Sequence, residues 1–260
     1  PPKVTHICEG AFASCQLRKI EISSNSELKV IEKEAFCCSC IESISIPSSV
    51  VKLKKGWCSQ TSNLIHISVM PNNKYYSSYN ENKFIIGKSS YKKDIFDVLV
   101  FSVRNIETAI IPSFIEIIGP YAFSGCDELK KIGFSNDSNL QIIDECAFCY
   151  SSIGKIIIPP HVTKICQSAF SYCVDFIKVS FSMNSEIQII EEKAFACSSI
   201  ESIFIPKKIK DIGQYAFSFC KRLQILEINN NLKSFKSIHN IFVGCQNVIF
   251  MSPFMFDLND

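Results

Sequence analysis

The chain has 260 residues, of which 47% are hydrophobic and 20% are charged, a composition that excludes a disordered chain. The 27 Lys and Arg residues against 25 Asp and Glu leave a net charge of +2, so nucleic acid and anionic membranes are not expected as partners. The apolar runs are far shorter than the roughly 18 residues of a membrane helix, so we expect no membrane insertion in this segment.

An internal repeat organises the chain. The dipeptide Ala-Phe recurs seven times, and we assign Gly56-Trp57 and Ile241-Phe242 to the same slot. The steps between successive aromatic residues are 24, 21, 66, 25, 22, 25, 22 and 25 residues, so long and short units alternate around one gap. A unit of this length cannot bury its apolar side alone, and stacked copies solve that problem. The pattern therefore predicts a solenoid.

The chain opens on Pro1–Cys8, which parallels Pro159–Cys166, so we expect further residues upstream in the natural protein. After each aromatic residue come three spaced apolar residues, such as Ile41, Ile44 and Ile46, and the last two alternate as in a short strand. In the short units this strand ends at a proline, which cannot donate to a ladder. These prolines are Pro47, Pro112, Pro159 and Pro206.

The stretch between such a proline and the next Ala-Phe, for example Val162–Ile165, predicts a turn followed by a short helical or irregular segment, whose Phe fills the interior. Residues 70–105 depart from this scheme. The pattern predicts two strands around a turn, at Lys83–Lys88 and Phe96–Val103, and we interpret them as an extended, β-hairpin-like unit. We expect residues 1–260 to form a single solenoid; a second domain at the interruption is the alternative.

A family resemblance rests on the run Ile205–Cys220 and on its copies Ile111–Cys126 and Ile158–Cys173. These runs resemble the repeat of BspA-like leucine-rich repeat proteins. The resemblance implies a β-rich, right-handed superhelix with short parallel strands on one face and short helical or irregular segments on the other. It also implies a surface antigen, located at the cell surface or secreted, that attaches microbes or protist parasites to host cells or matrix proteins.

The 14 cysteines follow the register of the repeat. Equivalent cysteines two units apart lie roughly 10 Å from one another, too far for a disulfide. We therefore expect buried free thiols, while disulfides between unlike registers remain the alternative. The two Cys-x-x-Cys pairs, Cys37–Cys40 and Cys146–Cys149, fall several turns apart, so we expect no metal site. Asn136 begins the tripeptide Asn-Asp-Ser, a possible glycosylation site.

The sequence shows no recognisable arrangement of catalytic residues. The four histidines share no local cluster with a Cys or Asp, and the predicted outward strand positions hold only Glu21 and Glu227 as acids, at opposite ends. We therefore expect neither an enzymatic activity nor a cofactor, and the glycan hydrolase that converging carboxylates would indicate is not favoured.

The predicted outward strand positions suggest a binding face. Lys131, Lys155 and Lys178 fall on consecutive turns beside Ile157 and Phe204, an arrangement that suits an acidic or sulfated partner. An ordinary solvated strand face is the alternative. We expect a non-enzymatic cell-surface adhesion protein that presents a concave leucine-rich repeat face to a host or matrix protein. An intracellular, cytoplasmic scaffold for protein–protein interaction is the competing function.

Overall fold

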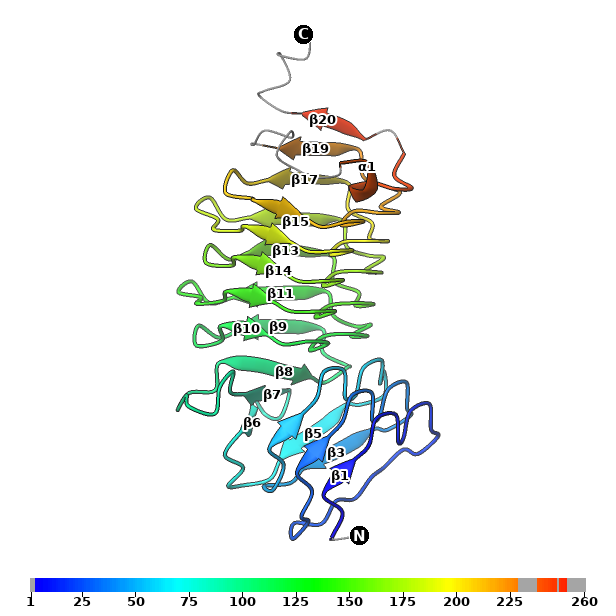
Figure 1. Cartoon of the computed structure of the whole chain (residues 1–260), viewed down its shortest axis with the longest axis vertical. Helices are drawn as coiled ribbons and strands as arrows, with labels where there is room; N and C mark the ends of the chain where they lie inside the picture. Colours follow the sequence, from blue (N-terminus) through cyan, green and yellow to red (C-terminus); the bar gives the residue numbers. More distant parts are fainter. Residues whose placement is uncertain (1–2, 229–237, 247, 252–260) are drawn as a thin grey trace.

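The computed structural model describes residues 3–228, 238–246 and 248–251. Within these residues the chain winds through repeated units, so that most strands pair in parallel with the equivalent strand one unit away. Figure 1 shows the strands from β9 to β20 stacked along the long axis, with β1, β3 and β5 inclined to that stack. The N-terminal units and the remaining units meet at residues 70–107, which we call the joint.

Strands of three or four residues form one face of the stack, which we call the strand face. Before the joint, β3 (Ser43–Ile46) and β5 (His66–Val69) form a two-stranded sheet. After the joint comes a seven-stranded sheet, whose strands lie side by side in chain order. Its strands are β9 (Thr108–Ile111), β11 (Lys131–Phe134), β13 (Lys155–Ile158), β15 (Lys178–Phe181), β17 (Ser202–Ile205), β19 (Ile225–Ile228) and β20 (Ile249–Met251). The parallel strands predicted from the repeat are thereby confirmed.

The opposite face carries a second set of parallel sheets, built from two-residue strands, and here the predicted helical segments are wrong. The first set is β1 (His6–Ile7), β2 (Val30–Ile31) and β4 (Lys52–Leu53). After the joint come β10 (Ile117–Ile118), β12 (Ile142–Ile143), β14 (Lys164–Ile165), β16 (Ile189–Ile190) and β18 (Asp211–Ile212). In the ranges that the structure describes, the only helix is the single turn α1 (Ile238–Ile241).

Backbone geometry explains why the segment around each Phe is not helical. Cys146 and Tyr150, two residues before and two after Phe148, have φ values of 52° and 60°. This left-handed conformation cannot continue a right-handed helix. The Phe148 N–H instead donates to the carbonyl of Ala169 in the next unit, at 2.8 Å. Hydrogen bonds of this kind recur along the stack, so the turns themselves form a ladder between units.

Stacked phenylalanine rings form the core between the two faces. Consecutive rings have centroids 5.0 to 5.6 Å apart and planes within 8° of one another. The stack consists of Phe123, Phe148, Phe170, Phe195, Phe217 and Phe242. Burying one such ring stabilises the fold by about 1.5–3 kcal/mol. The Ala-Phe repeat is therefore the sequence signature of a continuous aromatic core.

The joint interrupts this order. β6 (Tyr76–Tyr79), β7 (Phe84–Gly87) and β8 (Val98–Ser102) are antiparallel neighbours, and β8 joins them to the sheet of two-residue strands through β10. The rings of Phe36 and Trp57 meet at 85° instead of stacking. The predicted slot of Trp57 is wrong by one residue, because its carbonyl accepts the Phe36 N–H, as the alanine carbonyls do elsewhere.

A buried arginine connects the units on either side of the joint. The Arg104 backbone N–H donates to the carbonyl of Leu64 at 3.0 Å. Its guanidinium donates to the carbonyls of Cys58 and Ala122, at 3.4 and 3.2 Å, and lies over the ring of Phe101. Arg104 therefore adds side-chain hydrogen bonds across the joint, to carbonyls that also accept from the Thr61 hydroxyl and the Ser102 N–H.

Candidate binding surface

Two rows of outward side chains run along the strand face, because side chains alternate between the core and solvent in each strand. The first row contains Thr108, Lys131, Lys155, Lys178, Ser202 and Ile225, which are direct partners across neighbouring strands. The second row contains Ile110, Gly133, Ile157, Ser180, Phe204 and Glu227. Each strand of the seven-stranded sheet up to β19 thus contributes one residue to each row.

The three lysines of the first row, Lys131, Lys155 and Lys178, form a continuous basic strip that we call the lysine row. All three are exposed. Among the described residues, no carboxylate lies within 4.0 Å of their ammonium groups, whereas many other lysines have such partners. Two like charges about 5 Å apart in water repel by about 0.8 kcal/mol. An acidic partner would relieve this repulsion.

A hollow of about 760 Å³ lies beside the lysine row. Gly133 forms part of its lining, and a Cβ atom added at Gly133 would meet no heavy atom within 4 Å. Ile157, which is 65% exposed, and Pro159 supply apolar surface. The hollow opens where β11 and β13 pair only at Lys131 and Lys155, whereas β13 and β15 pair along four residues. We call this recess the Gly133 hollow.

The predicted site residues lie in three places relative to the Gly133 hollow. Lys131, Lys155 and Ile157 line the Gly133 hollow, and Lys178 continues the row from Lys155. Phe204 lies two strands beyond β13, is 44% exposed and does not line the hollow. The missing side chain at Gly133 is the signal in the sequence that could have located the recess.

The possible glycosylation site lies at the rim of the same hollow. Asn136 is exposed and lines the recess in the turn after β11. The Ser138 N–H donates to the carbonyl of Ser135 at 3.0 Å and closes this turn. A glycan attached to Asn136 would therefore sit beside the lysine row.

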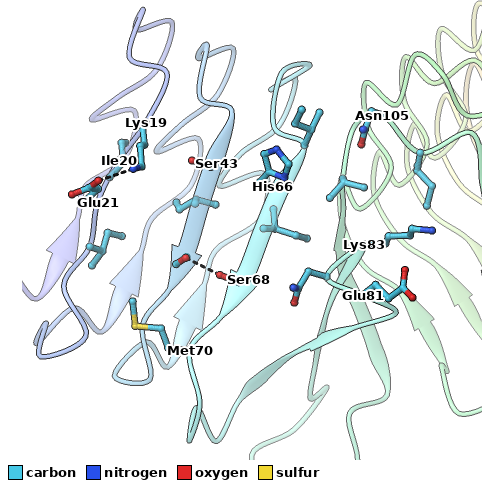
Figure 2. A pocket seen from close by; sticks show the side chains of 18 of the residues that line it. Lys19, Ile20, Glu21, Ser43, His66, Ser68, Met70, Glu81, Lys83 and Asn105 are labelled. Atoms are coloured by element: carbon cyan, nitrogen blue, oxygen red, sulfur yellow. Dashed lines mark hydrogen bonds and ion pairs between the residues drawn. The ribbon is translucent and has the colours of Figure 1, made fainter.

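A larger cleft, of about 1290 Å³, occupies the joint and was not predicted. Figure 2 shows Ser43, His66 and Ser68 along its floor and Glu81, Lys83 and Asn105 on the opposite wall. The floor is largely polar: the hydroxyls of Ser45 and Ser68 are 2.7 Å apart. We call this recess the joint cleft. The departure of residues 70–105 from the repeat marks the joint in the sequence, but it does not indicate a cleft.

The wall of the joint cleft is held by backbone hydrogen bonds. Asn80, Glu81 and Asn82 have φ values of 51°, 53° and 62°, so three successive residues are left-handed. The Lys83 N–H donates to the carbonyl of Asn80 at 2.9 Å, and the Val103 N–H donates to that of Lys83 at 3.0 Å. The loop is thus fixed at both ends, although left-handed residues other than glycine cost free energy.

The structure contains the cysteines as free thiols, but only six of the 14 are buried, so the expected burial is wrong for the other eight. Three of the cysteines that lie three residues after an aromatic slot, Cys173, Cys220 and Cys245, donate to the carbonyl of the Phe in the preceding unit. The Sγ–O distances are 3.0 Å for Cys173 to Phe148, 3.1 Å for Cys220 to Phe195 and 2.9 Å for Cys245 to Phe217. Burial raises the pKa of the Cys173 thiol to about 12. The Cys173 thiol therefore acts as a small buried donor rather than as a nucleophile.

The described residues also bear on metal sites and membrane spans. No group of three or more His, Cys, Asp and Glu side chains in that part of the chain has an arrangement suited to a metal ion. None of its helices is long and apolar enough to cross a bilayer.

Comparison with known proteins gives a family match. A family model for the BspA type leucine-rich repeat region, in six copies, matches residues 1–85, 94–187 and 135–249. No curated protein matches the chain significantly.

Solved structures share the fold. A leucine-rich cell surface protein from Faecalibacterium prausnitzii A2-165 has a TM-score of 0.69 at 23% identity, over 97% of this chain and 58% of its own. A leucine-rich repeat protein from Eubacterium ventriosum ATCC 27560 has a TM-score of 0.67 at 20% identity, over 93% and 68%. The pneumococcal vaccine antigen PcpA has a TM-score of 0.65 at 20% identity, over 94% and 59%. The chain therefore spans about three fifths of the length of the first and third of these proteins.

Proposed function

Because this chain belongs to the family of BspA-type leucine-rich repeat proteins, we propose that it is a non-enzymatic binding protein whose strand face contacts a host or matrix protein. The observation that carries the proposal is the lysine row beside the Gly133 hollow. The row offers positive charge without a carboxylate partner among the described residues, and the hollow offers space next to apolar surface. An apolar anchor in a pocket supplies affinity at protein interfaces, and complementary charge around it supplies specificity.

The chemistry of the face defines the partner. Lys131, Lys155 and Lys178 suit a row of carboxylates spaced like equivalent residues on adjacent strands, about 5 Å apart. The Gly133 hollow suits one apolar side chain that projects between these carboxylates. We therefore expect a protein partner with an acidic surface that carries an exposed aliphatic or aromatic residue.

The location that we propose is the cell surface. The Faecalibacterium protein of similar fold is described as a cell surface protein, and PcpA is described as a vaccine antigen. A surface location would expose the strand face to host proteins and would give access to the glycosylation machinery that Asn136 requires.

The test compares two double variants with the same change in charge. Lys155→Glu/Lys178→Glu reverses two members of the lysine row, while Lys207→Glu/Lys208→Glu reverses two exposed lysines outside it. Binding to a panel of immobilised matrix proteins and to cultured host cells would be measured for both variants and for the unchanged chain. We expect at least a tenfold loss for the first variant and less than a twofold loss for the second.

Two results would count against the proposal. Equal losses in the two variants would mean that only net charge matters, and an unchanged chain that binds none of the panel would remove the adhesion role. Circular dichroism on each variant would establish that the fold is retained.

Free thiols favour a second candidate, an intracellular scaffold that uses the same face. Cytosolic proteins keep their cysteines reduced, whereas secreted proteins usually pair them. The discriminating measurement is a count of alkylated thiols by mass spectrometry on natively expressed protein under non-reducing conditions. Fourteen alkylated cysteines would support the scaffold, while paired cysteines with a glycan on Asn136 would support the surface protein.

A further inference from the structure

The spacing of strands shows that the strand face lacks one strand at the joint. β5 begins 23 residues after β3, and the strands from β9 onward begin 23 or 24 residues apart. β9, however, begins 42 residues after β5, which is close to two repeats. The structure places no strand of the strand face between them in this fully described segment. The loop at Glu81–Lys83 and the joint cleft occupy that region instead.

The missing strand leaves one edge of β9 without a partner. The Lys131 N–H donates to Glu107 O at 3.3 Å, and the Ser135 N–H donates to Ile111 O at 3.1 Å. The residues of β9 that bond to β11 are therefore those at odd positions, including Ala109. Because the backbone groups of a strand alternate in direction, the N–H and C=O groups of Thr108 and Ile110 point away from β11, toward the joint.

The corresponding edge of β5 is covered at Val69, the last residue of the strand. The Val69 N–H donates to the hydroxyl of Ser78 in β6 at 2.8 Å. β9 has no such contact in the described part of the chain: its strand pairing is to β11 alone. A parallel strand with unpaired backbone groups readily accepts another chain. The open edge at the joint is therefore that of β9.

The joint cleft has room for a peptide. One residue of a strand occupies roughly 160 Å³, from its rise of about 3.3 Å, a strand separation of about 4.8 Å and a sheet separation of about 10 Å. The cleft of about 1290 Å³ is therefore comparable with a strand of about eight residues. Arg104 and the hydrogen bonds of Lys83 fix its walls, so little ordering would be required on binding.

We propose that the free edge of β9 takes up an extended segment of a protein partner, which adds to the seven-stranded sheet as an extra strand. Main-chain hydrogen bonds to Thr108 and Ile110 would supply the affinity. The cleft carries both signs of charge, Lys19 and Lys83 against Glu81 and Glu107, over a floor of serines. The segment that fits is therefore uncharged, with small or β-branched side chains. This site is separate from the lysine row and rests on the proposed function only in taking a protein ligand.

The test uses substitution by proline, which removes the N–H of one residue. At Ile110 this N–H points to the joint, so Ile110→Pro deletes an edge donor and leaves the bonds to β11 in place. Ile110→Val is the matched control, because it changes the side chain and keeps the donor. Thr108→Pro, at the first residue of β9, is the second variant should Ile110→Pro fail to fold.

The probe is a phage-displayed library of random decapeptides, selected on the unchanged full chain. Peptides from the selection would be synthesised and their dissociation constants measured by calorimetry. We expect at least a tenfold loss of affinity for Ile110→Pro, a change below twofold for Ile110→Val, and no change for Lys155→Glu/Lys178→Glu. Because the Lys155→Glu/Lys178→Glu variant alters only the lysine row, its peptide affinity shows whether the peptides bind at β9 or at the lysine row.

Two outcomes would overturn the added strand. One is a set of selected peptides that bind the proline variants as tightly as the unchanged chain. The other is a selection that yields no peptide binder while the chain still binds matrix proteins through the lysine row.

Discussion

At the scale of single residues, the repeat assigns one task to each position. The Phe ring stacks on the ring of the next unit, the preceding Ala carbonyl accepts the N–H of the Phe in the unit before, and the cysteine three residues later donates to a Phe carbonyl. Such positions tolerate few replacements, since each touches the neighbouring units as well as its own. Exposed aromatic residues of the strand face carry no comparable constraint.

Phe170→Ala removes one ring from the middle of the stack. Phe170 is completely buried and stacks on Phe148 and Phe195. We expect the free energy of unfolding to fall by about 3–5 kcal/mol, as for other buried aromatic residues replaced by alanine. Phe204→Ala is the control, because Phe204 is half exposed, and its effect should be well under half as large. Urea unfolding followed by circular dichroism measures both; equal effects would contradict the core assigned to the stack.

Gly133→Val fills the hollow beside the lysine row. The added side chain meets open space at its Cβ, and a β-branched residue suits a strand, so stability should stay constant or rise by about 0.5 kcal/mol. Binding of the matrix protein identified with the lysine-row variants should nevertheless fall, because the side chain occupies the recess. Thermal unfolding and surface plasmon resonance measure the two effects. Unchanged binding would remove the hollow from the interface.

Cys173 and Cys8 should differ in their reaction with iodoacetamide at pH 8. With the pKa of Cys173 raised to about 12 by burial, about one thiol in ten thousand is ionised at that pH. Cys8 is exposed. We expect Cys8 to be modified within minutes and Cys173 only after denaturant is added, as read by mass spectrometry. Rapid labelling of native Cys173 would contradict its burial.

At the scale of elements, the loop between β7 and β8 depends on one buried carboxylate. Asp97 accepts hydrogen bonds from the backbone N–H and the hydroxyl of Ser89 and from the ammonium of Lys93. Burial raises its pKa, but the hydrogen bonds of Lys93 and Ser89 outweigh that effect, so the pKa is lowered from its ordinary value. Lys93 also pairs with Glu116 at 2.8 Å, beside β10. The loop is thereby tied to the first unit after the joint.

Asp97→Asn should loosen this loop. Because the pKa of Asp97 is lowered in the folded chain, its contribution to stability is fully present above the pKa of the unfolded chain, near 3.9. This contribution is lost as the pH falls through the pKa of Asp97 in the folded chain. The substitution should cost about 2 kcal/mol at pH 7, and the difference from the unchanged chain should disappear toward pH 2. Denaturant unfolding at several pH values measures it. A difference that stays constant below pH 4 would contradict the role of the charge.

Some of the strands could be predicted from the sequence, and others could not. The strands and the pairing of Lys131 with Lys155 follow from a count of residues, because the repeat fixes the register. The second sheet could not be read in this way, since two-residue strands carry no periodicity, and left-handed residues such as Tyr150 and Cys146 are not glycines. The joint cleft depends on how units on both sides of residues 70–107 are inclined, which no local pattern encodes.

At the scale of the whole molecule, Arg104 connects two stacks of units. Arg104→Met keeps a long side chain in the core but removes the guanidinium hydrogen bonds to the carbonyls of Cys58 and Ala122, which keep the Thr61 hydroxyl and the Ser102 N–H as donors. Losing a hydrogen bond from a charged donor costs about 1.5–3 kcal/mol. We expect the N-terminal units to unfold before the others in this variant, giving two transitions in calorimetry. A single transition at an unchanged temperature would show that the units are coupled by other contacts.

The hydrogen-bonded turns also determine how the molecule responds to force. The turns bond each unit to the next along the stack, so a chain pulled at its two ends is expected to release units one at a time from the end of the stack. A unit adds about 5 Å to the folded length but about 80 Å once it is drawn out, from the extended length per residue. A tether built in this way lengthens many times over under load while the units that remain stacked keep their binding surface intact.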